Sequence, residues 1–181
     1  MSADHRQRGG GESLDELLAA LRKALERHKV PTRHEARPVL LALGAEIVAG
    51  RNESVDAAVR ALHEIFPSSG PSSEAASRKG EPDDARRGSA QAAWSADWRA
   101  AVADELSMAC TEFVRSVDPQ HLTHPRYDFE YTLQARERLE LRLRAAERLG
   151  LPLGEAWSSQ VERADERLEA VRRKGRPGGG S

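Results

Sequence analysis

Residues 68–93 have the sequence SSGPSSEAASRKGEPDDARRGSAQAA, which contains no Val, Ile, Leu, Met, Phe, Trp, Tyr or Cys. A segment of this composition cannot bury enough apolar surface to offset the conformational entropy that folding would cost it. On both sides of the segment, apolar residues recur every three or four positions, which is the period of an amphipathic helix. We therefore expect an all-α protein in which a disordered linker, 68–93, joins two small helical modules.

The N-terminal module is expected over residues 13–67. Capping boxes at Ser13 and Thr32, each with Glu three positions later, predict two helix starts. Pro38 lies within the second of these helices, so that helix is either kinked or begins near Pro38. A third apolar stripe predicts a helix over 54–66, and the module is therefore a three-helix unit.

The C-terminal module is expected over residues 94–174. Its first helix carries one apolar stripe, made of Trp94, Trp98, Val102, Leu106, Cys110, Phe113 and Val117. A second helix is predicted to begin near Pro125, and a third has a narrow coiled-coil-like seam: Trp157, Val161, Ala164, Leu168 and Val171. Short connections between helices of similar length favour antiparallel neighbours, so we expect a three-helix antiparallel bundle. Residues 1–12 are predicted to be disordered and 175–181 to form a flexible tail.

Composition and charge limit the classes of function. The formal net charge is −1, with equal numbers of acidic and basic residues in 1–67, so nucleic acid is not the partner we expect. No apolar stretch approaches the ~20 residues that span a bilayer, residues 1–12 lack the apolar part of a signal peptide, and Cys110 is the one cysteine. We expect a cytoplasmic protein without membrane contact, and the Arg- and Ala-rich composition suggests a bacterial source. Cys110 lies on an apolar stripe and is predicted to be a buried structural thiol.

One cluster has residue types that could ligate a metal. His121 and His124 form a His-x-x-His pair in a predicted loop, and Asp128 could be a third ligand. The competing interpretation, which we favour, is a helix–helix turn in which Asp118 and Thr123 cap backbone groups and the histidines are partly exposed.

The tryptophans are candidate partner-binding residues. Trp is enriched at binding hot spots, and Trp94 and Trp98 lie on one helical face beside the predicted linker. The favoured alternative is that these two, together with Trp157, cover the open end of the C-terminal bundle.

The chain contains no Gly-rich phosphate loop and no nucleophile elbow, and we expect no cofactor. The sequence favours a non-enzymatic interaction or adaptor protein that binds protein partners or self-associates through its amphipathic helices. One alternative is a DNA-associated transcriptional regulator that uses the second and third helices as a helix-turn-helix, although the predicted recognition helix offers only Arg60 and His63 as basic groups. A second alternative is a metal-binding protein or enzyme at His121 and His124.

Overall fold

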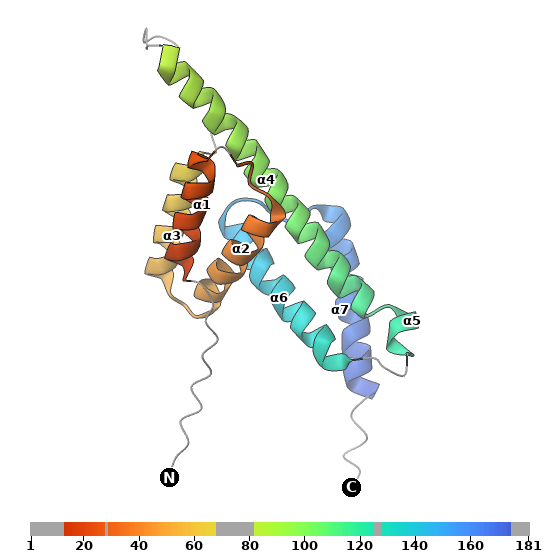
Figure 1. Ribbon diagram of the computed structural model, residues 1–181. Helices are drawn as coiled ribbons and strands as arrows, with labels where there is room; N and C mark the ends of the chain where they lie inside the picture. The colour runs from red at the N-terminus through yellow and green to blue at the C-terminus, as the bar shows by residue number, and fades with distance from the viewer. Residues whose placement is uncertain (1–12, 28, 68–81, 125–127, 175–181) are drawn as a thin grey trace, which may run out of the picture.

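A computed structural model describes residues 13–27, 29–67, 82–124 and 128–174. Within these ranges every regular element is a helix and no strand occurs, so the predicted all-α class is confirmed (Figure 1). None of the described helices has the length and apolar character needed to cross a membrane. The helices are α1 Leu14–Glu26, α2 Arg33–Val48, α3 Asn52–Ile65, α4 Pro82–Ser116, α5 Pro119–Leu122, α6 Phe129–Arg148 and α7 Glu155–Lys174.

Both predicted capping boxes are present. The Glu16 carboxylate accepts a hydrogen bond from the Ser13 N–H at 2.8 Å, and Ser13 Oγ accepts one from the Glu16 N–H at 3.3 Å. At the start of α2, the Glu35 carboxylate accepts from the Thr32 N–H at 3.0 Å. These reciprocal bonds satisfy backbone donors that have no partner within the first turn of a helix. All five leucines of the predicted α1 stripe are buried: Leu14, Leu17, Leu18, Leu21 and Leu25.

Helix α2 begins at Arg33 and continues through Pro38 rather than starting there. Proline costs the helix one backbone hydrogen bond, but α2 buries Ala36, Val39, Leu40 and Leu43 almost completely. The apolar area that these residues remove from water is large enough to offset one missing hydrogen bond.

Helix α4 begins at Pro82 and therefore extends into the predicted linker; residues 68–81 lie outside the described part of the chain. The sequence from Pro82 places Pro at the first helical position, follows it with two Asp, and continues with several Ala. Pro and acidic residues are favourable at a helix N-terminus, and Ala has the highest helix propensity. A segment without apolar residues buries little surface. It can still extend a helix that has already formed, because adding residues to an existing helix is easier than starting a new one.

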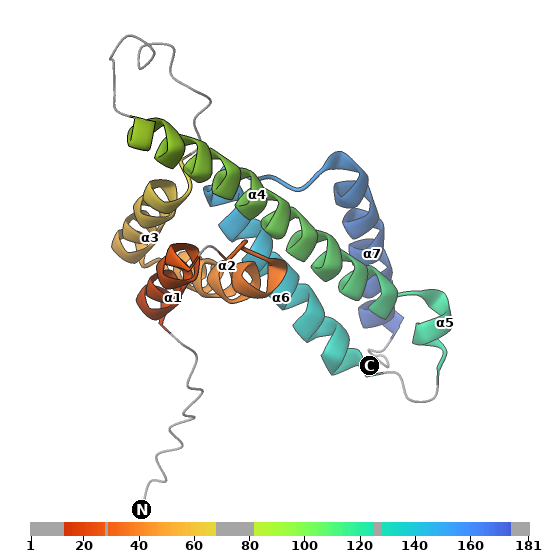
Figure 2. The same ribbon diagram turned by 45° about the horizontal axis from the view of Figure 1, so that its top comes forward.

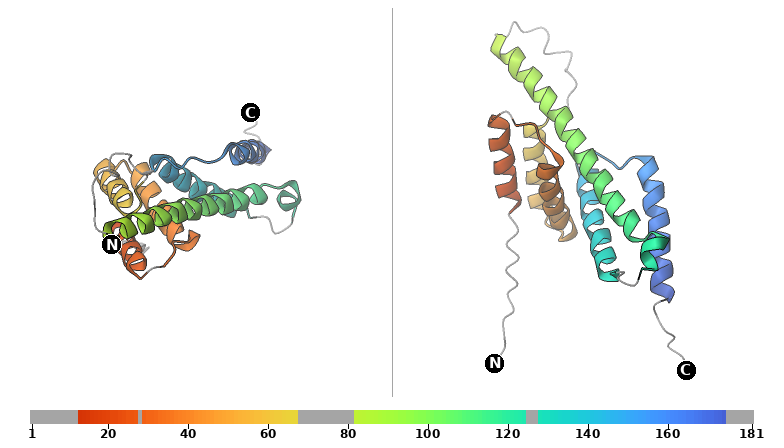
Figure 3. Two further views of the ribbon diagram at one scale, coloured as in Figure 1. Left: turned by 90° about the horizontal axis from the view of Figure 1, so that it is seen from above. Right: turned by 45° about the vertical axis from the view of Figure 1, so that its right-hand side comes forward.

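Helix α2 packs directly on α4 and α6, and α1 and α3 pack on α2 and on each other (Figures 1 and 3). One hydrophobic cluster contains the buried residues of α1, α2 and α3 together with Trp98, Val102 and Leu106 of α4 and Ala145 and Ala146 of α6. The predicted separation into two modules is thus not confirmed. The helical periods identified most of the buried apolar residues, but the stripe on α4 is shared between two sets of helices.

A second cluster lies further along α4 and unites it with α6 and α7. These three helices run antiparallel in chain order (Figure 2). Three residues of the predicted α7 seam, Val161, Ala164 and Leu168, are buried in this cluster, so most of that seam is covered by the chain itself. The Arg136 guanidinium also pairs with Asp165 of α7, at 2.6 Å.

Helices α2 and α6 approach each other closely at Gly44. A Cβ atom placed on Gly44 would lie 2.1 Å from the carbonyl oxygen of Leu141 in α6. Because that oxygen belongs to helix backbone, it cannot rotate away as a flexible side chain could. Gly44 is therefore the residue that allows α2 to lie against α6.

A buried charge cluster links α2, α4 and α6. Glu105 of α4 is completely buried, and its Oε1 accepts a hydrogen bond from Arg37 Nε of α2 at 2.9 Å. Arg142 Nε of α6 lies 2.8 Å from the same oxygen, an ion pair rather than a well-directed hydrogen bond. Burial lowers the pKa of the Arg142 guanidinium, and the charge of Glu105 opposes that effect. A buried guanidinium of this kind requires its carboxylate to remain close.

Gly44→Ala is expected to destabilise the protein by about 2 kcal/mol or more, although Ala is normally the better helix former, because the new methyl group forces α2 and α6 apart. Urea unfolding followed by circular dichroism measures the change. Gly154→Ala is the matched control, since a Cβ there meets nothing within 4 Å. Equal effects of the two substitutions would contradict the close approach.

Glu105→Gln is expected to lower the free energy of unfolding by about 3 kcal/mol, because Arg142 stays buried without a counter-charge. The double variant Glu105→Leu, Arg142→Met removes both charges and is expected to recover most of that loss. Asp104→Asn, at the next position but exposed, is the control and should change stability by less than about 0.5 kcal/mol. A Glu105→Gln protein as stable as the control would show that the pair is not buried.

Candidate functional site

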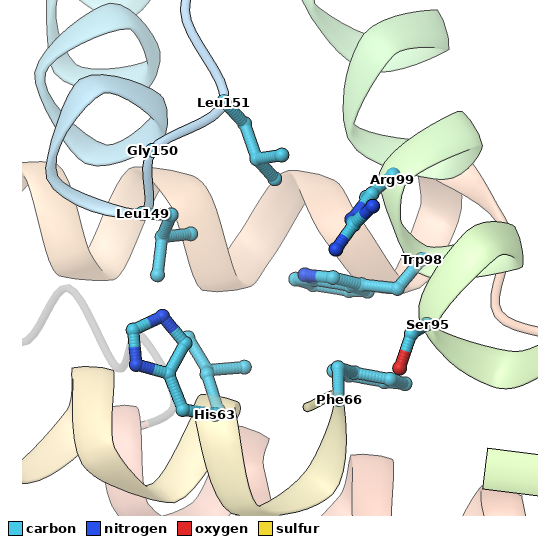
Figure 4. A pocket seen from close by; sticks show the side chains of 9 residues that line it. His63, Phe66, Ser95, Trp98, Arg99, Leu149, Gly150 and Leu151 are labelled. Atoms are coloured by element: carbon cyan, nitrogen blue, oxygen red, sulfur yellow. The ribbon is translucent and has the colours of Figure 1, made fainter. Parts of the chain in front are cut away.

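A pocket of about 300 Å³ lies where the C-terminal end of α3, helix α4 and the α6–α7 connection meet. Its inner side includes two stacked aromatic rings, Phe66 and Trp98, whose centroids are 4.8 Å apart and whose planes differ by 2°. Figure 4 shows these rings edge-on, with Leu149 and Leu151 approaching from the opposite side. We call this site the junction pocket, because it is formed by segments from both halves of the chain.

Local structure fixes each side of the junction pocket. Phe66 is the C-cap of α3, and its N–H donates to the Leu62 carbonyl at 2.7 Å. Helix α6 ends in a Schellman motif, in which the Leu151 N–H donates to the Ala146 carbonyl at 2.8 Å. Gly150 has φ of 70° there, a conformation that other residues adopt only with strain. This turn brings Leu149 and Leu151 to the pocket.

The polar groups of the junction pocket are basic or neutral. His63 reaches toward it from α3, and Ser95 and Arg99 from α4 (Figure 4). Its described lining residues include no Asp or Glu, and within the described ranges neither His63 nor Arg99 forms an ion pair. The site therefore combines an apolar interior with an exposed basic rim.

The three tryptophans do not lie together. Trp98 is 3% exposed, and Trp94 is partly buried against the same cluster. Trp157, in the first turn of α7, packs instead on the second cluster. Sequence reasoning identified Trp98 but not its neighbours Phe66, His63 and Arg99; the position of Phe66 at the end of a helical apolar stripe was the one available signal.

His121 lies in the short helix α5 and not in a loop as predicted, His124 follows that helix, and Asp128 precedes α6. Asp118 caps α5, accepting from the Gln120 N–H at 2.9 Å, as the favoured interpretation predicted. Asp128 caps α6, where its Oδ1 accepts from the N–H groups of Glu130 and Tyr131 at 3.0 and 3.2 Å. In the described part of the chain, no three His, Cys, Asp or Glu residues are grouped as metal ligands would be.

A second hollow, of about 390 Å³, lies between α4 and α6, and we call it the α4–α6 groove. Met108 and Tyr131 line it and are 43% and 44% exposed. The Tyr131 hydroxyl donates to Glu112 Oε1 at 2.9 Å, a bond that raises the pKa of Tyr131. Glu112 Oε1 also forms an ion pair with Arg138 Nη2, at 3.5 Å.

The remaining charged groups of the groove are basic. Arg115 is exposed and pairs with no carboxylate in the described ranges, and His121 lies at the edge of the groove. Arg37 uses its Nε to hold Glu105, while the side chain stays about half exposed in the groove. The α4–α6 groove thus joins two exposed apolar side chains to an excess of basic groups.

Helices α2 and α3 correspond to the predicted helix-turn-helix, so the exposed surface of each bears on DNA binding. One face of α2 is buried in the core, and α3 exposes Glu53, Arg60, His63 and Glu64. Glu64 lies 3.5 Å from Arg22, and Asp56 of α3 pairs with Arg148 of α6. The exposed surface of α3 is therefore of mixed charge.

Cys110 is fully buried between α4 and its neighbours, and burial raises the pKa of its thiol to about 11. Since the thiolate is the reactive form, the native protein is expected to resist labelling by a disulfide reagent at about pH 8. Labelling should become rapid and stoichiometric when urea unfolds the chain. Rapid stoichiometric labelling of the native protein would contradict this placement.

Comparison with models of known families, with curated proteins and with solved structures finds no match to this chain.

Proposed function

We propose that this protein is a non-enzymatic adaptor whose α4–α6 groove binds an acidic, partly apolar segment of a protein partner. The observation that carries the proposal is the position of Met108 and Tyr131 beside Arg115. Met, Tyr and Arg are enriched at protein interfaces relative to the rest of the surface, and Tyr and Arg are frequent hot spots.

The shape of the groove supports a helical or extended partner segment. Helix α4 supplies most of its lining, and Tyr131 of α6, Arg37 of α2 and His121 of α5 complete it. A hollow between packed helices is a usual setting for an amphipathic segment to dock with its apolar face inward. Met108 can adapt to different apolar side chains because its thioether chain is flexible. Tyr131 is held in place by its bond to Glu112, so it loses little freedom when a partner binds.

The charges of the groove select for acidic partners. Glu112 is already matched by Tyr131 and Arg138, whereas Arg115 has no carboxylate partner within the described residues. A partner carboxylate would pair with Arg115 without displacing an existing ion pair. Charge complementarity of this kind contributes to specificity and to the association rate.

The alternatives have less support. The mixed charge on α3 offers little to neutralise DNA phosphates, and Asp128 is engaged as a helix cap instead of lying beside His121 and His124 as a ligand. Neither observation favours a regulator or a metal site over an adaptor.

Selection of short random peptides on the purified full chain tests the proposal. Selected peptides are expected to place Asp or Glu next to Leu, Phe or Met. A selected peptide should bind Met108→Ala and Arg115→Glu about tenfold more weakly than the original protein, by fluorescence anisotropy.

Arg167→Glu on α7 is the matched control, because Arg167 is equally exposed, makes no ion pair in the described residues and lies outside the groove. This variant should bind the peptide as the original protein does. Peptides without acidic residues, or equal losses for Arg115→Glu and Arg167→Glu, would refute binding at the groove.

A further inference from the structure

We propose that the junction pocket binds a small monocarboxylate with an apolar body, such as a medium-chain fatty acid. The site is separate from the α4–α6 groove, and the inference does not depend on the proposed adaptor function. It rests on the size of the pocket, its aromatic interior and the charge of its rim.

The size and lining of the junction pocket suit a small molecule. Its volume of about 300 Å³ lies at the lower end of the range of ligand pockets, about 300–1,000 Å³. Such pockets are mostly apolar with a few polar groups, and they often form where two parts of a chain meet. Leu62, Phe66, Trp98 and Leu151 supply the apolar surface here.

The rim of the pocket determines the charge of the ligand. Arg99 and His63 enter from different helices, and both are exposed, so their N–H groups can reach a ligand at the opening (Figure 4). Since the described lining includes no carboxylate, an anionic head group gains attraction and meets no repulsion. An ammonium head group on the same apolar body would be disfavoured. A neutral one would gain only the apolar contact.

A bound ligand would touch three segments that are distant in the sequence: the end of α3, residues Ser95 to Arg99 of α4, and the turn at Gly150. Anything that binds the folded chain at such a junction, and not the unfolded chain, raises its stability by mass action. Thermal stabilisation is therefore a second readout of binding.

Octanoate, 1-octanol and octylamine are suitable probes, because they share one apolar body and differ in charge. In a Trp94→Phe, Trp157→Phe background, Trp98 is the remaining tryptophan and reports occupancy by fluorescence. Octanoate is expected to give a saturable change and to bind about fivefold more tightly than octanol. Octylamine should bind more weakly than octanol. The wild-type chain should show the same order in thermal shift.

Arg99→Gln is expected to weaken octanoate binding about fivefold and to leave octanol binding unchanged. Leu151→Trp, which fills the pocket, should abolish the thermal shift caused by either compound, a readout that the added tryptophan does not disturb. The control Arg167→Gln, outside the pocket, should change neither. No saturable signal, equal affinity for octanoate and octylamine, or unaltered binding by Leu151→Trp would each overturn the proposal; circular dichroism confirms that the variants are folded.

Discussion

The close packing of α2 on α6 is the constraint on which the rest of the structure depends. Gly44 allows the two helix backbones to approach each other. Glu105 of α4 forms ion pairs with Arg37 of α2 and Arg142 of α6, and so links α4 to both helices. This close contact, the buried charge cluster and the shared hydrophobic cluster together hold the N-terminal helices on the C-terminal ones. The junction pocket exists only because of this arrangement, since its walls come from both halves.

Much of the local structure could be predicted from the sequence. The capping boxes at Ser13 and Thr32 are present, and so is the leucine stripe of α1. Each depends only on residues three or four positions apart in the sequence. Packing between the halves could not be predicted, because a stripe such as Trp98, Val102 and Leu106 shows that one face is buried but not what covers it. The start of α4 at Pro82 differs from the prediction for another reason: low apolar content favours disorder, but the helix propensity there is high.

The candidate sites were harder to predict than the helices. His121, His124 and Asp128 are adjacent in sequence, but the Asp128 carboxylate faces the first N–H groups of α6. Phe66, Arg99 and Leu151 meet only in the folded chain, and no spacing in the sequence relates them. Helix α4 contributes to both hollows, Trp98 and Arg99 to the junction pocket and Met108 and Arg115 to the α4–α6 groove, with the buried Glu105 between them. A rigid α4 therefore sets the relative positions of the two proposed sites.

The contact between α2 and α6 should make both halves fold as one cooperative unit. Native-state hydrogen exchange on the full chain tests this directly, because it reports the opening free energy of individual amides. Core amides of α2, such as those of Leu40 and Leu43, are expected to exchange with the same global free energy as those of Val102 and Leu139. A clearly lower opening free energy for all of α1, α2 and α3, with α4 and α6 still protected, would show instead that the halves are independent modules.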